Sequence, residues 1–516
     1  MNKIIKNNLF FFGILPFIIG VFSSFSLPPY NFTFINFITF PLLLLIVFRL
    51  KEKKIKLNSY FIVGWLFGFG YFLTNIYWII FSLTFDEIYK NIIPLALIIL
   101  PSFLAIFYGL VILLLFKVNT KKIFTTLLIF SLLFAILEYI RGIILSGFPW
   151  NLISYSWSPS INSIQIISLI GTYSFNLISI TLFSLPLIFF LKVPNTIKIN
   201  LLIMLFTLIS LNYFYGFNKI NSKKKIQQNI NNYNIKIISP KIPIKKFIKN
   251  IDEEEILVNL IKLSDPKKDL PTVFIWPEGV LSGIYFDELK KYKDLFLNNF
   301  SKNHIIIMGI STHSFENENE EVYNSMIAVD SNLNLLSKYN KNKLVPFGEF
   351  LPLEAFFKNL GLKKITYGYS SFTEGNKREI IEINKFKFLP LICYEIIYSG
   401  EISHNKKDFD LIINISEDGW FGNSIGPHQH FSHSIFRAIE EGKNILRSAN
   451  NGISAYINSN GIVIDKIEST QRGVIEIKSL EKTNKTLFSS FGNKIFFYFI
   501  LFYIILIFFI NKWERT

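Results

Sequence analysis

The sequence contains a single cysteine, Cys393, which ends the apolar stretch 386–393. A lone cysteine in this position is most often a small buried apolar residue, so by itself it predicts no activity. A thiol becomes a nucleophile when a nearby base takes its proton and a nearby cation stabilises the thiolate. We therefore ask whether the chain supplies a base and a cation in similar positions.

Two other segments supply these groups. Glu278, set between a proline and a glycine, follows the apolar stretch 272–276, and its carboxylate can act as a base. In the segment 339–349, Lys341 and Glu349 flank a turn, and Lys343 is a second lysine. An ammonium group can stabilise both a thiolate and the oxyanion that forms when a carbonyl is attacked. A carboxylate, a cation and a thiol together favour thioester chemistry, although composition alone does not choose between the two lysines.

These residues belong to a region in which short apolar strands alternate with amphipathic helices. Strands buried on both faces between helices predict an α/β layered domain, and open sheets of this kind carry their sites beyond the strand ends. The predicted strands are 234–239, 272–276, 304–310, 323–329, 386–393, 409–415, 454–457 and 474–477. The predicted helices are 247–263, 287–300 and 428–444.

The rest of the chain has the composition of a membrane protein. Of its 516 residues, 51% are hydrophobic, and a membrane-spanning helix needs about 20 apolar residues. Apolar runs of this length occur near 9–27, 31–50, 59–83, 91–116, 123–141, 163–191, 199–217 and 490–511. We therefore predict three parts: a transmembrane domain of seven helices at 1–217, a catalytic domain at 218–485, and an eighth transmembrane helix with a short tail at 486–516.

The formal charge of +16 is explained by membrane topology. Lysine and arginine gather in alternate loops between the apolar runs, and such loops are cytoplasmic in membrane proteins. This pattern places both termini in the cytoplasm and the 218–485 domain outside it. It explains the basic residues better than nucleic-acid binding does, because they do not lie beside stacking aromatics. A single cysteine also excludes an internal disulfide framework.

The reactive segments resemble those of the nitrilase (carbon-nitrogen hydrolase) superfamily. The segments that carry the resemblance are 276–278, 339–349, 392–395, 414–431 and 437–452. In the membrane part, the stretch 147–151, with Glu138 and Arg141 before it, resembles the signature of the superfamily's membrane branch, the bacterial apolipoprotein N-acyltransferases. Soluble nitrilases have no such stretch, so the resemblance is specific to that branch.

The resemblance implies an α+β membrane protein, in which an eight-helix transmembrane bundle carries a nitrilase-like α/β sandwich of αββα layers. It implies that Glu278 is the general base, Cys393 the nucleophile and Lys341 the stabiliser of the oxyanion. The Tyr-x-Lys spacing of the family favours Lys341 over Lys343. Glu349 corresponds to a second functional glutamate of the family.

The resemblance also names supporting residues and substrates. Tyr394 and Glu395 support the site, and Trp150 lies in the membrane signature, where it could contact substrate. The implied reaction moves an acyl chain from a membrane phospholipid, through a Cys393 thioester, to the α-amino group of the S-diacylglyceryl-cysteine at the N-terminus of an apolipoprotein. The implied protein is a monomer in the bacterial inner membrane with a periplasmic catalytic domain, and it needs no cofactor.

Two alternatives remain open at this point. A membrane-anchored nitrilase-type amidase would use Glu278, Lys341 and Cys393 with water as the acyl acceptor. A transporter or receptor would carry the outer domain as an inactive binding module, although an inactive module has no need to keep all three reactive residues. The first alternative predicts cleavage of a small amide, and the second predicts that Cys393→Ala has no effect on lipoprotein acylation.

Two segments depart from the pattern of the family. Glu417-Asp418 stands where the family usually has Asn-Asp, and 239–241 (Ser-Pro-Lys) stands where Gln-x-Asn is common, with Phe247 near the family's tryptophan. These departures leave open which hydrogen bonds and substrate contacts the two segments make. The histidines of 428–433 suggest a metal site only superficially, because no carboxylate or thiol completes the set. We therefore predict no metal.

Overall fold

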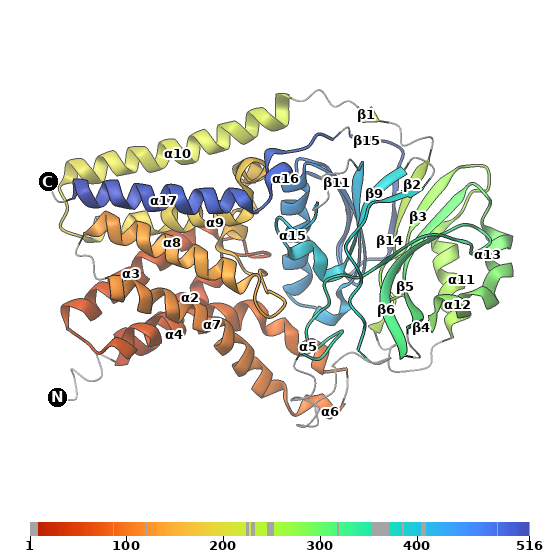
Figure 1. Ribbon diagram of the computed structural model, residues 1–516, viewed down its shortest axis with the longest axis horizontal. Helices are drawn as coiled ribbons and strands as arrows, with labels where there is room; N and C mark the ends of the chain where they lie inside the picture. The colour runs from red at the N-terminus through yellow and green to blue at the C-terminus, as the bar shows by residue number, and fades with distance from the viewer. Residues whose placement is uncertain are drawn as a thin grey trace. The chain divides into compact units, whose positions relative to one another are not determined.

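The computed structural model describes residues 9–85, 87–118, 122–222, 227–228, 233–244, 252–316, 319–352, 371–383, 386–403, 409–481 and 483–514. The chain forms two compact units (Figure 1). The first unit comprises Met1–Ile80, Asn91–Lys223 and Thr486–Thr516. The second unit comprises Lys224–Lys485 together with Phe81–Lys90, a short segment from the N-terminal half of the chain.

The first unit is helical. Its main helices are α2 (Leu15–Ser24), α3 (Asn36–Glu52), α4 (Leu57–Ile76), α7 (Ile93–Val118), α8 (Ile123–Arg141), α9 (Ile167–Ser184), α10 (Asn195–Ser222), α16 (Leu487–Phe491) and α17 (Lys494–Trp513). Among the described residues, seven helical stretches are long and apolar enough to cross a membrane. They are Thr33–Glu52, Leu57–Leu83, Ile93–Val118, Ile123–Arg141, Ser163–Phe190, Asn195–Ser222 and Lys494–Trp513. The apolar run predicted at 9–27 forms a shorter helical stretch, Phe10–Ser24.

A buried ion pair lies inside the first unit. Arg141 Nη2 lies 3.5 Å from Glu138 Oε1, and both side chains are almost fully buried. Tyr108 donates a hydrogen bond of 2.8 Å to Glu138, and Asn176 donates another. The Arg141 guanidinium also lies over the Phe72 ring. Ionisable side chains within a membrane are costly unless they are paired, and these two groups are paired.

The second unit contains two large sheets. The first has the order β14-β2-β3-β5-β6-β7, with β4 paired to β5, and the second has the order β13-β12-β11-β10-β9-β8. The strands of the first sheet are β2 (Asn234–Ser239), β3 (Thr272–Ile275), β4 (Leu281–Tyr285), β5 (His304–Glu316), β6 (Asn319–Val329), β7 (Leu335–Asn340) and β14 (Gly473–Ile477). Those of the second are β8 (Ile381–Ile383), β9 (Phe386–Ile392), β10 (Leu411–Glu417), β11 (Asn444–Asn450), β12 (Ser454–Ile457) and β13 (Val463–Ile467).

The two sheets pack face to face, with β2 against β11 and β12, and helices cover their outer faces (Figure 1). Helices α11 (Glu253–Ser264), α12 (Phe286–Leu289) and α13 (Lys293–Asn299) lie on the first sheet, and α15 (Gly426–Glu441) lies on the second. The strands β2, β3 and β5 are parallel, as are β9, β10 and β11. The expectation of αββα layers is therefore confirmed.

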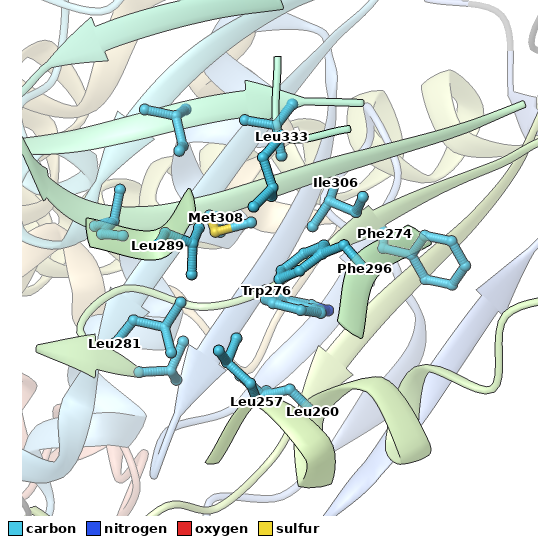
Figure 2. Packing of buried hydrophobic residues seen from close by; sticks show 14 of the residues in the cluster. Leu257, Leu260, Phe274, Trp276, Leu281, Leu289, Phe296, Ile306, Met308 and Leu333 are labelled. Carbon is cyan, nitrogen blue, oxygen red and sulfur yellow. The ribbon is translucent and has the colours of Figure 1, made fainter. Parts of the chain in front are cut away.

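A hydrophobic core between the first sheet and its helices fixes the end of β3 (Figure 2). Trp276 is fully buried there against Phe296 and Phe300, and its indole N–H donates to the Ser264 hydroxyl at 2.9 Å. Truncating a buried tryptophan to alanine costs about 3–5 kcal/mol. Because Glu278 follows Trp276 by two residues, this packing holds the backbone from which Glu278 projects.

Several strands were not predicted, among them β4, β7, β8, β11 and β13. The clearest error lies at the end of α15, which was predicted to run to residue 444. The helix ends at Glu441 because Gly442 takes a φ of +63°, and β11 begins at Asn444. Strand β11 is buried along its whole length although its sequence, Asn-Ile-Leu-Arg-Ser-Ala-Asn, is half polar. Its polar side chains find hydrogen-bond partners inside the fold, so no apolar pattern marks the strand.

The segment Phe81–Lys90 packs within the second unit. The Phe85 ring lies edge-on to Trp420, with 5.6 Å between the centroids. Gly422 has a φ of +60°, and a Cβ atom there would lie 2.6 Å from the Phe81 ring. Only glycine leaves room for this contact. The domain expected at 218–485 had not included this segment.

Candidate active site

The three predicted catalytic residues all follow strand ends. Glu278 comes shortly after β3, Lys341 follows β7 directly, and Cys393 follows β9 directly. All three side chains are buried, and they interact electrostatically, because the Cys393 thiol feels the charges of both Glu278 and Lys341. Two strands of the first sheet and one strand of the second therefore build one buried cluster.

The Lys341 ammonium lies between two carboxylates. Its Nζ atom is 2.8 Å from Glu349 Oε1 and 3.4 Å from Glu278 Oε1. Burial by itself lowers the pKa of an ammonium, but these carboxylates raise the pKa of Lys341 above its ordinary value. The lysine is therefore charged at neutral pH. Glu349 is held in turn by the Val345 backbone N–H, at 2.9 Å from Oε2.

Glu278 is oriented by two hydrogen bonds. Asn324 Nδ2 donates to Oε1 at 2.7 Å, and the Glu417 backbone N–H donates to Oε2 at 3.0 Å. The neighbouring Gly309 is required, because a Cβ atom there would lie 2.7 Å from the Glu278 Cα. Burial raises the pKa of Glu278 above that of an ordinary glutamate, although Lys341 opposes this shift. A carboxylate with a raised pKa suits the role of general base.

Asn324 is a site residue that the sequence did not reveal. It lies on β6, and its Nδ2 donates to Glu349 Oε1 at 2.7 Å as well as to Glu278. Its backbone carbonyl oxygen accepts a hydrogen bond of 2.8 Å from the Lys341 backbone N–H. One side chain thus spaces the two carboxylates around the lysine. The signal in the sequence is an amide within a stretch, predicted as a strand at 323–329, that is apolar or aromatic apart from Asn324 and Ser325.

Cys393 begins a 3-10 turn, Cys393–Ile397, with a φ of +49°. A non-glycine residue in this left-handed region is strained, and such strain concentrates at functional sites. Burial and the Glu278 charge raise the pKa of the thiol, while Lys341 and the Ser416 hydroxyl lower it by smaller amounts. The thiol is therefore protonated at rest, so a base must remove its proton before it can attack.

Glu395 joins the segment that carries the lysine to the segment that carries the nucleophile. Its Oε1 accepts from Tyr339 OH at 2.5 Å, from Arg378 Nη2 at 3.0 Å and from the backbone N–H groups of 342–343 at 3.1 and 3.2 Å. Its Oε2 accepts from the Ile392 N–H at 2.8 Å. Glu395 therefore fixes the distance between the two segments. Tyr394 is buried, and its ring lies 5.4 Å from that of Tyr398.

The two departures from the family pattern meet in one hydrogen-bond network. The Glu417 carboxylate accepts from Asn450 Nδ2 at 2.7 Å and from Asn451 Nδ2 at 3.2 Å. The side chains of Asn450 and Asn451 in turn bind the backbone of Ile242, directly after the 239–241 segment. Where the family usually has an asparagine, whose amide both donates and accepts, Glu417 has a carboxylate that can only accept hydrogen bonds. Phe247 lies outside the described residues.

His430, one of the histidines at 428–433, contacts the backbone of Cys393. His430 is fully buried, with Nδ1 2.9 Å from Asp418 Oδ1 and Nε2 3.3 Å from the Cys393 carbonyl oxygen. Arg447 donates to Asp418 Oδ2 at 2.7 Å. Burial raises the pKa of a carboxylic acid, but chiefly the Arg447 charge lowers the pKa of Asp418 below its usual range. Within the described part of the chain, no group of three or more His, Cys, Asp or Glu residues is arranged to hold a metal ion.

Trp150 belongs to the first unit, whereas Glu278, Lys341 and Cys393 belong to the second. It is buried, with its ring 4.8 Å from that of Trp78 and stacked on Phe148 at 6.1 Å. These aromatic contacts explain its burial by packing alone. A role for Trp150 in substrate contact stays a prediction from the sequence.

Two family models match the chain. The model of the apolipoprotein N-acyltransferase N-terminal domain matches residues 19–185, and that of the carbon-nitrogen hydrolases matches residues 247–478. Apolipoprotein N-acyltransferase of Rickettsia typhi is 34% identical over 489 residues, which cover 93% of this chain and 94% of that protein. The protein of the same name from Brucella suis is 29% identical over 480 residues, with 90% and 89% covered. A solved CN-hydrolase superfamily protein from Xanthomonas campestris covers 48% of the chain at 16% identity, with a TM-score of 0.33.

Proposed function

The chain belongs to the apolipoprotein N-acyltransferase family, and from this premise we propose that it transfers an acyl chain from a membrane phospholipid, through a thioester on Cys393, to the N-terminal amine of a diacylated apolipoprotein. The observation that carries the thioester is the arrangement of Lys341 between Glu278 and Glu349 beside a buried thiol. This arrangement supports the assignment of Glu278 as the base, Lys341 as the cation and Cys393 as the nucleophile.

In the first step, Glu278 takes the proton of the Cys393 thiol, and the thiolate attacks the ester carbonyl of the phospholipid. The oxyanion is stabilised by the Lys341 ammonium and by the Tyr394 backbone N–H. The tetrahedral intermediate then collapses, and the C–O bond of the ester breaks. The lysophospholipid leaves with the proton that Glu278 returns to its oxygen, and the acyl group stays on sulfur.

In the second step, the α-amino group of the apolipoprotein attacks the thioester carbonyl. Glu278 accepts the proton that the amine loses, and Lys341 again stabilises the oxyanion. The C–S bond breaks, and the Cys393 thiolate recovers its proton from Glu278. The enzyme returns to its starting state, and the apolipoprotein carries a new amide bond.

The net charge of the buried cluster stays constant while the thiol proton moves to Glu278. At rest, the two carboxylates and the lysine leave the cluster with one net negative charge. When Glu278 is protonated and the thiolate has formed, the net charge is the same, so the proton moves within the cluster and no charge enters from solvent. This feature favours proton transfer inside a buried site.

The test uses purified protein in detergent micelles with a phospholipid that carries an isotope-labelled acyl chain. Mass spectrometry should find the labelled acyl group on Cys393, and addition of a diacylated lipopeptide should move it to the peptide amine. Cys393→Ser should show no labelled thioester. If the label never reached Cys393 and the protein cleaved a small amide instead, the chain would be an amidase rather than an acyltransferase.

We further propose that the protein is a monomer of the bacterial inner membrane. The 218–485 domain lies in the periplasm, and both termini are cytoplasmic. The distribution of lysine and arginine among the loops supports this orientation. It would place the catalytic residues on the side where a phospholipid and a lipid-anchored apolipoprotein can meet in the same leaflet.

A further inference from the structure

His430 makes a contact that the proposed mechanism leaves unused. It is the fifth residue of α15, and its side chain is fully buried. Its Nε2 atom is 3.3 Å from the carbonyl oxygen of Cys393. A carbonyl oxygen can only accept a hydrogen bond, and the Arg447 guanidinium, 3.0 Å from Nδ1, can only donate one. Arg447 therefore favours the tautomer in which Nδ1 accepts and Nε2 carries the proton that it donates to the Cys393 carbonyl. His430 therefore holds the backbone of the nucleophile and not its thiol.

The orientation of the imidazole is fixed from its other side. Nδ1 faces Asp418 Oδ1 at 2.9 Å and Arg447 Nη2 at 3.0 Å. Asp418 is itself held by Arg447 at 2.7 Å and by the Ser416 hydroxyl at 2.6 Å. The ring edge of Phe421 packs against the imidazole with 5.5 Å between centroids. The ring thus has little freedom to turn away from Cys393.

The backbone that His430 holds is strained. Cys393 has a φ of +49°, and a non-glycine residue in this region costs about 1–3 kcal/mol unless its surroundings enforce the conformation. The bond from the Ile392 N–H to Glu395 at 2.8 Å enforces the turn from the residue before. The bond from His430 enforces it at the Cys393 carbonyl. Without His430, one of these two restraints is lost.

We propose that His430 is a positioning residue for Cys393. Its Nε2–H holds the Cys393 carbonyl, which keeps the strained turn and aims the thiol at Glu278 and Lys341. His430 touches neither substrate nor reacting atoms. The inference rests on the proposed function only in that Cys393 is the nucleophile, and it gives the histidine cluster of the sequence a role that needs no metal.

The test compares three substitutions at position 430. In His430→Gln, the side-chain amide can still donate to the Cys393 carbonyl. In His430→Asn, the amide is one methylene too short, and in His430→Leu there is no donor. The readout is the rate at which 2-chloroacetamide alkylates Cys393 in the full-length protein, followed by mass spectrometry. His428→Leu, at a partly exposed position of the same helix, is the matched control.

We expect alkylation of the Gln variant within about 3-fold of the unchanged protein, and rates for the Asn and Leu variants at least about 10-fold lower, because misplacing a nucleophile is costly even over short distances. The control should keep the unchanged rate. A purely structural role for His430 would lower thermal stability in all three variants without separating Gln from Asn. If the Leu variant does not fold, the Gln and Asn pair still decides the question.

Unchanged alkylation in the Asn and Leu variants would overturn the inference, and so would a Gln variant as slow as the Asn variant. The assay needs no phospholipid, so it separates this inference from the proposed function. Normal alkylation of the unchanged protein without any acyl transfer would contradict the acyltransferase mechanism and leave the role of His430 standing. If alkylation were as slow in the Gln variant as in the Asn variant while the unchanged protein transferred acyl groups, the role of His430 would be contradicted and the acyltransferase mechanism would stand.

Discussion

At the scale of single residues, the chemistry depends on where the protons sit in the cluster of Glu278, Lys341 and Cys393. Burial raises the pKa of Glu278, and burial with the Glu278 charge raises the pKa of the Cys393 thiol. Since Lys341 is charged across the ordinary pH range, Glu278 is the group whose protonation switches the site in the proposed mechanism. Only its deprotonated form can take the thiol proton.

This assignment predicts a pH dependence for thioester formation. The rate should fall as the pH decreases, with a midpoint above the ordinary glutamate value of 4.5, because burial raises the pKa of the base. The measurement is the initial rate of Cys393 acylation by labelled phospholipid from about pH 4 to about pH 9. In Glu278→Gln the rate should be very low at every pH. A midpoint below 4.5 would mean that a different group acts as the base.

Asn324 gives a second prediction at this scale. Asn324→Ala removes the amide that holds both Glu278 and Glu349. We expect acylation to slow by about 10- to 100-fold, or about 1.4–2.7 kcal/mol, with little change in KM for the phospholipid. Asn299→Ala is the control, since it removes a comparable amide hydrogen bond, 2.8 Å to the Leu295 carbonyl, on α13. An effect on KM alone would assign Asn324 to substrate binding.

The sequence predicted the reactive residues but not the residues that orient them. Glu278 and Cys393 stand out because each has a reactive side chain at the end of an apolar stretch, whereas Lys341 was preferred over Lys343 only through the family resemblance. Asn324 and His430 could not be assigned in the same way, because their roles depend on contacts with residues far away in the chain. Periodicity and spacing carry no information about such contacts.

At the scale of elements, helix α15, which lies on the second sheet, ends in a buried carboxylic acid. Glu441 is the last residue of the helix and is buried. Burial raises its pKa from 4.5 to about 7. The folded protein therefore binds a proton at Glu441 more tightly than the unfolded chain does. This difference lowers the stability of the fold as the pH rises from 4.5 to about 7, and the loss persists above that range.

Glu441→Gln should remove this penalty. The amide has nearly the shape of the protonated acid, so we expect the variant to be more stable at pH 8 by about 1–3 kcal/mol. At about pH 3.5, roughly one unit below the unfolded pKa, Glu441 is protonated in both states, so the stability should be nearly unchanged. The measurement is thermal unfolding in detergent at both pH values. An equal gain at both values would point to a packing effect instead of a titration.

The elements differ in how far their sequences reveal them. Strands β2, β3 and β12 were predicted within one residue of their observed bounds because β-branched or aromatic residues make up at least half of each. Strand β11 was not predicted, because Arg447 and the amides at its two ends are buried through specific partners, including Asp418 and Glu417. A strand that buries polar groups is recognisable only when those partners are known.

At the scale of the whole molecule, the orientation in the membrane is the prediction that depends on the entire chain. In a Cys393→Ser background, we expect Lys290→Cys, on the exposed surface of the second unit, to react with a membrane-impermeant maleimide in spheroplasts. Lys53→Cys, in a basic loop predicted to be cytoplasmic, should react only after lysis. Labelling is read by mass shift. The reverse pattern would invert the topology.

The sequence also indicated the membrane-spanning character of the chain, since apolar length alone sets it. It did not reveal that Phe81–Lys90 packs with the second unit. This segment directly follows the apolar run predicted at 59–83, and nothing in its composition separates it from an ordinary loop. Its partners, Trp420 and Gly422, lie in a distant part of the chain.

The contacts of Phe81–Lys90 bear on how the protein is made. Phe81 and Phe85 leave the ribosome long before Trp420 and Gly422, so this part of the second unit cannot close until nearly the whole chain has been synthesised. A secreted fragment that begins after the helices would lack the segment and would expose the Trp420 ring to solvent. The second unit is thus completed by a segment that is synthesised among the apolar helices and not by residues 224–485 alone.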